Sequence, residues 1–256
     1  MKKLLIAIPA YGQGEYLNET LKSLAENNAE SVNGLLETHV LVLDDGTPGG
    51  LEFKLPENNE HWHHAGSRSE LNQGVTRTWN LALEMAMRSL DVDYVMIANS
   101  DLHFGPNVLK ACVDALDSGY YAVFPESYKR RDKDGNVLTP HRYGGPLAKD
   151  FDARALAAAE TSSENTCVTG GFAGWCFMLS KECLDKIGWF DPRFVLWYQD
   201  TDYHQRLAAA GHPAAEVRNC LIHHYESRTI VNLPGGFNYQ GWITKDKELF
   251  ARKYAE

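Results

Sequence analysis

The sequence predicts an α/β fold in which a mostly parallel central sheet lies between two layers of helices. In the first half of the chain, short apolar runs alternate strictly with amphipathic stretches of helical spacing. This order is typical of parallel strands joined by right-handed crossovers. Several apolar runs end abruptly in polar residues, which places polar side chains at the carboxyl edge of the sheet, where open α/β sheets bind ligands.

The first four elements follow from apolar spacing. Residues 3–8, KLLIAI, predict a buried strand, and a helix follows near Glu15 to Asn27, where leucines recur at helical spacing. THVLVLDD, residues 38–45, predicts a strand that ends in two acids. The next helix is expected over residues 75–90, with an apolar face that includes Val75, Trp79, Leu83 and Met87.

The remaining elements are a strand at residues 94–98, a helix at 108–116 and a strand at 120–125. The second half is less regular. We expect a helix from Thr201 to Ala209 and a strand from Glu216 to Ile222, whereas residues 127–164 are long enough to form one wall of a cleft. No low-complexity linker divides the 256 residues, so one domain is predicted.

Composition narrows the class of protein. With 44% hydrophobic and 23% charged residues, the chain is an ordinary globular protein, and a formal charge of -9 argues against a broad phosphate-coating surface. The N-terminal apolar run is broken by Pro9, so we read it as a strand and not as a signal peptide. No apolar stretch approaches the about 18 residues that span a bilayer, and any membrane association is expected to be peripheral. Five cysteines without a CxxC pair predict reduced thiols in a cytoplasmic protein.

Polar residues gather at the ends of three predicted strands, namely Pro9, Ala10 and Tyr11, then Asp44, Asp45 and Gly46, and then Asn99, Ser100 and Asp101. One such end has a simple explanation, because Asn and Asp form turns and cap helices. Two acidic strand ends on neighbouring strands bring negative charges close together, and a cation or a hydrogen-bond donor is needed to stabilise them. YGQGEY has only part of the dinucleotide fingerprint, so NAD binding is not favoured.

Several motifs occur in order between residue 3 and about residue 230. They are IPAYGQGEYLNETLKSL, LVLDDGTPGG, LNQGVTRTWNLAL, the NSD of residues 99–101, and a long stretch from VTGGFAGW to QDTDYHQRL. Together they resemble the family 2 glycosyltransferases with the GT-A fold, especially their bacterial rhamnosyltransferase-like branch. NSD is similar to the branch's N-x-D form of D-x-D. The sequence departs from the family at Gln199, where relatives have glutamate, and at Trp79, where many have arginine.

The resemblance implies inverting transfer of a sugar from a nucleoside diphosphate sugar to a hydroxyl group, with Mg²⁺ or Mn²⁺ as the cofactor. It implies that Asp44 accepts hydrogen bonds from the base, that Asp101 binds the cation, and that Asp45 or Asn99 completes the ribose or metal contacts. His223 or His224 would complete the metal site, with His223 preferred. The other donor-binding candidates are Pro9, Ala10, Tyr11, Asn72, Arg77 and Arg228, the last in a lid with Thr229 and Gly235-Gly236.

Asp200 is expected to be the general base, because it matches the carboxylate that the family places opposite the leaving group. By itself, Asp200 has a simpler explanation as the cap of the helix from Thr201 to Ala209, and the two roles are compatible. The HWHH cluster of His61, His63 and His64 has weak zinc-like spacing, and a surface or strand position is favoured for it.

We therefore expect a single GT-A domain over residues 1–256, a three-layer sandwich. It would comprise a nucleotide-sugar-binding half at 1–125, an acceptor and catalytic half at 126–230, and a C-terminal lid and helix at 231–256. The expected acceptor is a glycan or a lipid-linked sugar, and a modified nucleic-acid base is kept as an alternative acceptor. Two other functions are considered: nucleotidyl transfer, and a nucleotide-sugar-binding module without turnover. The expected location is the cytoplasm or the inner face of the membrane, and the oligomeric state is left open.

Overall fold

The computed structural model describes residues 1–128, 147–160, 167–225 and 239–255. Within these ranges one nine-stranded sheet has the order β3-β2-β1-β4-β8-β6-β9-β5, and β7 pairs with β9. The strands are β1 (Lys2–Ala10), β2 (Leu36–Asp44), β3 (Trp62–Arg68), β4 (Tyr94–Ala98), β5 (Leu102–Phe104), β6 (Ala122–Ser127), β7 (Cys167–Thr169), β8 (Cys176–Ser180) and β9 (Ala215–His224). The helices are α1 (Gly14–Asn28), α2 (Val75–Met85), α3 (Val108–Asp117), α4 (Phe151–Ala159), α5 (Lys181–Ile187), α6 (Gln199–Ala209) and α8 (Tyr239–Lys253).

The sheet is mixed. The first four strands along it, β3, β2, β1 and β4, are parallel, and β8 then runs antiparallel to both β4 and β6. Because β6 is parallel to β9, six of the nine strands in the described ranges share one direction. The shared direction brings the carboxyl ends of β1, β2 and β4 to one edge.

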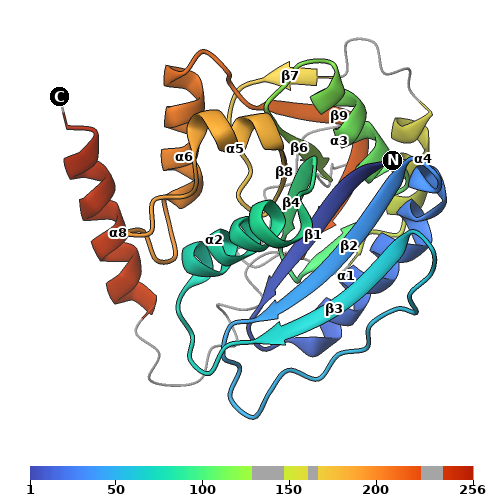
Figure 1. Ribbon diagram of the computed structural model, residues 1–256, viewed down its shortest axis with the longest axis horizontal. Helices are drawn as coiled ribbons and strands as arrows, with labels where there is room; N and C mark the ends of the chain where they lie inside the picture. Colours follow the sequence, from blue (N-terminus) through green and yellow to red (C-terminus); the bar gives the residue numbers. More distant parts are fainter. Residues whose placement is uncertain (129–146, 161–166, 226–238, 256) are drawn as a thin grey trace.

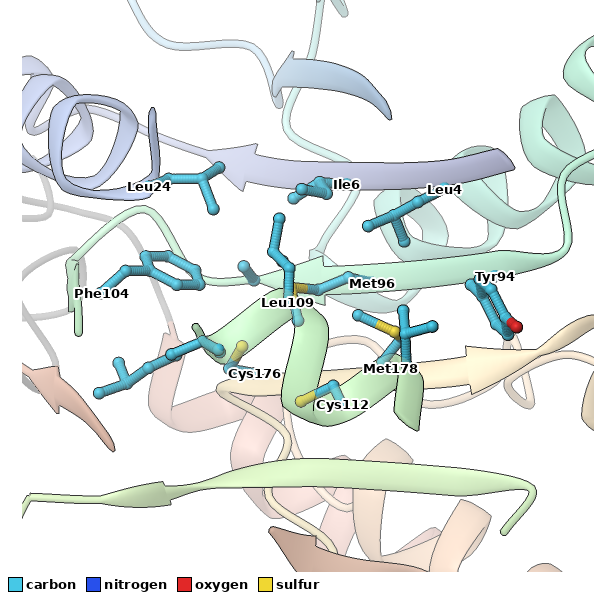
Figure 2. Close-up of a cluster of buried hydrophobic side chains, with 14 of the residues drawn as sticks. Leu4, Ile6, Leu24, Tyr94, Met96, Phe104, Leu109, Cys112, Cys176 and Met178 are labelled. Carbon is cyan, nitrogen blue, oxygen red and sulfur yellow. The ribbon is translucent and has the colours of Figure 1, made fainter. Parts of the chain in front are cut away.

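Helices cover both faces of the sheet, which confirms the predicted three-layer α/β fold (Figure 1). Successive side chains of β1 point to opposite faces of the sheet. Leu4 and Ile6 pack with α1 and α3 on one face, and Leu5 and Ala7 pack with α2, α5 and α6 on the other. Figure 2 shows the first of these layers, in which β1, β4 and β8 lie against α3 through Leu4, Ile6, Met96, Met178, Leu109 and Cys112. All five cysteines are free thiols, as predicted.

Several element boundaries differ from the prediction. The helix expected over residues 75–90 is α2 followed by a π-helical turn at Ala86–Leu90. α6 begins at Gln199 and not at Thr201, and β9 continues past Ile222 to include both His223 and His224. In Figure 1, α8 stands at the edge of the molecule beyond α6. None of the helices in the described ranges has the length and apolar character that a membrane crossing requires.

Candidate active site

A cavity of about 360 Å³ lies at the carboxyl edge of the sheet. One wall consists of residues from strand ends, namely Pro9, Ala10, Tyr11, Asp45, Asn99, Ser100 and Asp101. The start of α2 contributes Asn72, Gly74, Val75, Thr78 and Trp79, and the rest of the lining consists of Gly174, Trp175, Leu196, Trp197, Tyr198, Gln199, Asp200, His224 and Trp242. Nine of the predicted site residues therefore share one cavity, and they come from both halves of the chain.

Asp45 shapes the part of the cavity next to α2. Its carboxylate accepts hydrogen bonds from the backbone amides of Gln73 and Gly74, at 3.0 and 3.1 Å. Burial raises the pKa of the Asp45 carboxyl, and these two hydrogen bonds act in the opposite direction. The end of β2 is thereby tied to the turn that contains Asn72.

Asp44 lies just outside the cavity lining, although it is next to Asp45. It is 4% exposed, accepts a hydrogen bond from the amide of Thr47 at 2.9 Å, and has Arg68 Nε at 3.5 Å from its Oδ2. These contacts hold the turn after β2. Arg77 also lies elsewhere, in a separate depression of about 250 Å³. Arg228 and the predicted lid fall outside the described residues.

The structure distinguishes the two neighbouring histidines. His224 Nε2 lies 3.2 Å from Asp101 Oδ1, and the His224 ring stacks on Trp175 with centroids 5.4 Å apart. His223 points to the other side of β9, where its ring lies edge-on to those of Phe151 and Tyr225. The prediction that His223 is the histidine of the metal site was therefore wrong. Side chains alternate along a strand, and of the two histidines His224 is the one beside Asp101.

Asp101 and His224 form a donor set that fits a divalent cation. A carboxylate and an imidazole nitrogen face the same cavity, and the Asn99 side chain lies 3.5 Å from the His224 ring. Mn²⁺ accepts both oxygen and imidazole ligands, and Mg²⁺ prefers oxygen. The described residues contain no cluster of three or more His, Cys, Asp or Glu side chains that could hold a metal. The pair would therefore need further oxygen ligands, which a diphosphate can supply.

Asp200 lines the same cavity from the first turn of α6. The residue at the N-cap is Tyr198, in the left-handed region with φ 66°, so the interpretation of Asp200 as the cap was wrong. The Asp200 carboxylate accepts a hydrogen bond from the amide of Thr201 at 2.7 Å. Burial raises the pKa of this carboxyl, and the bond from Thr201 acts against the increase.

Sequence reasoning missed the aromatic side chains that line the cavity. We call Trp175, Trp197, Tyr198 and Trp242 the aromatic wall; Trp197 is 45% exposed although it lines the cavity. The signal for Trp175 lay in the Gly-rich GGFAGW segment, where Gly174 packs directly against Asp200.

The two positions that depart from the family have different surroundings. Trp79 is 1% exposed, and its ring contacts those of Phe177 and Phe190 edge-on, so it is a core residue that also borders the cavity. Gln199 is 6% exposed, and its side-chain oxygen has no hydrogen-bond partner within the part of the chain that the structure describes. His63 and His64 lie in strand β3, as favoured for the HWHH cluster.

Solved structures define the class of protein to which this fold belongs. GalNAc-T7 with UDP, GalNAc and Mn²⁺ has a TM-score of 0.60 at 13% identity, over 87% of this chain and 44% of that one. The mannosyltransferase PcManGT from Pyrobaculum calidifontis, in complex with GDP-Man and Mn²⁺, has a TM-score of 0.57 at 16% identity, over 94% of this chain and 60% of that one. The chain thus spans roughly half of their length, and it has the GT-A glycosyltransferase fold.

Residues 5–188 match the model of the family Glycosyl transferase family 2, and the chain belongs to this family and is a glycosyltransferase. The N-acetylglucosaminyl-diphospho-decaprenol L-rhamnosyltransferase of Mycobacterium tuberculosis is 24% identical to it over 241 residues, which cover 88% of this chain and 77% of the relative. These findings confirm the predicted family, its rhamnosyltransferase-like branch and the GT-A fold. The nucleotidyltransferase alternative is set aside.

Proposed function

We propose that the protein transfers a sugar from a nucleoside diphosphate sugar to a hydroxyl group of a carbohydrate acceptor, with inversion and with the help of Mn²⁺ or Mg²⁺. One observation carries the proposal: Asp101, His224 and Asp200 line a single cavity, and His224 Nε2 lies 3.2 Å from Asp101 Oδ1. In a single displacement the leaving group and the attacking hydroxyl lie on opposite sides of the reacting carbon, so we assign the leaving group to Asp101 and His224 and the hydroxyl to Asp200.

On the donor side, Asp101 and His224 would hold the divalent cation, with Asn99 beside them. The cation supplies positive charge that offsets the charge developing on the departing diphosphate. Pro9, Ala10 and Tyr11 at the end of β1 line the same wall, and we assign the nucleotide to this side. Asp44 would act on the base only through the turn that it holds, since it lies outside the cavity lining.

On the acceptor side, Asp200 serves as the general base. The acceptor oxygen attacks the anomeric carbon, the bond from that carbon to the diphosphate oxygen breaks, and the hydroxyl proton passes to an Asp200 carboxylate oxygen. Burial raises the pKa of this carboxyl, which makes the carboxylate a better proton acceptor.

A sugar on a lipid diphosphate is the acceptor class that we favour, because the M. tuberculosis relative is named for such a substrate. Its name also makes L-rhamnose the first sugar to test. We place the reaction in the cytoplasm, with peripheral access to the membrane face. Residues 1–125 form the donor half of the enzyme in this proposal, and residues 126–230 with the C-terminal segment form the acceptor half.

The test combines a panel of UDP-, GDP- and dTDP-linked sugars with an N-acetylglucosaminyl diphosphate carrying a short polyprenyl chain, with and without Mn²⁺. Asp200→Asn should lower kcat by about 10²- to 10⁴-fold and leave donor binding unchanged in a thermal-shift assay. Asp152→Asn is the matched control, because that carboxylate is 86% exposed on α4. Transfer by Asp200→Asn at the wild-type rate would refute the role of the base, and donor binding without turnover in the wild type would point to a binding module.

A further inference from the structure

The side chain of Asp246 is buried between α8 and the loop that precedes α6. Asp246 is 1% exposed, and its Oδ2 accepts hydrogen bonds from the backbone amides of Leu196 at 2.8 Å and Trp197 at 2.9 Å. The amide of Val195 lies 3.1 Å from both carboxylate oxygens. One carboxylate thus binds three consecutive backbone amides.

This arrangement suits an anionic side chain. Hydrogen bonds from amides to an ionised carboxylate are stronger than those between neutral groups, and successive amides in a turn form a concave site for an anion. The amides of residues 195–197 belong to no strand or helix, so Asp246 supplies the acceptor that secondary structure supplies elsewhere. The path of this loop therefore depends on a residue of α8.

A second set of contacts ties α8 to the first turn of α6. Asp202 is fully buried; its Oδ1 lies 2.5 Å from Lys253 Nζ and accepts a hydrogen bond from the Tyr254 hydroxyl at 2.8 Å. The ring of Phe250, one turn after Asp246, packs against that of Tyr198 with centroids 5.1 Å apart. The segment that contains Trp197 and Asp200 is thus held by α8 on both sides.

We infer that Asp246 is a positioning residue for the acceptor side of the cavity. It fixes the loop of residues 195–197, and through this loop it sets Trp197 of the aromatic wall beside the acceptor hydroxyl that Asp200 deprotonates. The inference rests on the proposed function in one respect, because that function identifies the wall of Asp200 as the acceptor side. Trp242 of α8 lines the same cavity, so the helix contributes both an anchor and part of the lining.

Steady-state kinetics separate positioning from a general structural role. Asp246→Ala should raise KM for the N-acetylglucosaminyl diphosphate acceptor by about 10-fold or more, with KM for the donor close to wild type. The melting temperature should fall as well, because three backbone amides lose their acceptor. Asp246→Asn keeps one acceptor oxygen and should recover part of the loss. Glu248→Ala, on the exposed face of the same helix, is the matched control and should leave both constants unchanged.

Hydrogen exchange supplies a measurement that does not need turnover. In Asp246→Ala the amides of residues 195–197 should exchange about 10-fold faster or more, whereas those of β1 and β4 should exchange as in the wild type. Unchanged exchange in the loop, or donor and acceptor constants that rise together, would overturn the inference. If the wild type transfers no sugar, the proposed function fails and the exchange result alone decides whether Asp246 anchors the loop.

Discussion

Gly174 packs against the carboxylate of Asp200, so a single added methyl group tests whether the position of that carboxylate matters. An alanine Cβ at residue 174 would lie 2.5 Å from Asp200 Oδ2 and 2.9 Å from its Cγ. The Asp200 carboxylate must move by about 0.9 Å to restore an ordinary contact of 3.4 Å. A displacement of about 1 Å in a reacting group lowers catalytic rates by as much as about 100-fold. We therefore expect Gly174→Ala to lower kcat by roughly two orders of magnitude.

The assay measures initial rates of sugar transfer with the donor and acceptor of the proposed reaction. KM for the donor should stay near its wild-type value, because the three atoms nearest to the new Cβ all belong to Asp200. Gly66→Ala is the matched control: it lies in β3, where a new Cβ would meet only the end of the Phe53 ring, at 3.1 Å. A kcat of Gly174→Ala equal to that of the wild type would refute the requirement for a precisely placed Asp200.

Two further predictions concern protons and metal. Since burial raises the pKa of Asp200 above the ordinary 3.8, and the base acts only when ionised, kcat/KM for the acceptor should be full at higher pH and fall as pH drops through that raised pKa. An identical acidic limb in Asp200→Asn would contradict this assignment. For the metal, isothermal titration should show Mn²⁺ affinity rising by about 10-fold or more when a nucleoside diphosphate is present, because Asp101 and His224 supply only part of a ligand shell. Asp101→Asn should abolish the increase, and tight Mn²⁺ binding without nucleotide would refute it.

The parallel half of the sheet could be predicted because its signals are local. Continuous apolar runs in β1, β2 and β4 and helical spacing in α1 and α2 are visible within about 15 residues. The direction of β8 could not be predicted, because an apolar run has the same period whether its neighbours are parallel or antiparallel. β5 has only three residues, too few for a periodic signal.

The candidate site was predictable where it lies on strand ends and less so where it depends on distant contacts. Asp101 follows directly after an apolar run, whereas the choice between His223 and His224 needed the true end of β9. Alternation along that strand, extended by two residues, would have separated the pair. Asp246 gave no signal at all, because an acid within a polar helix is ordinary and its partners are backbone amides about 50 residues earlier.

The bond between α8 and the loop of residues 195–197 has a consequence for the order of events during synthesis. At elongation rates of about 5–20 residues per second, about 2 to 10 s separate the addition of Trp197 from that of Asp246. During this interval β1, β2 and β4 are already present and β9 with His224 is added, while the amides of the loop lack their carboxylate. In a nascent chain, the residues that we assign to the nucleotide at the end of β1 are therefore in place before the loop of residues 195–197 on the acceptor side can take up its final path.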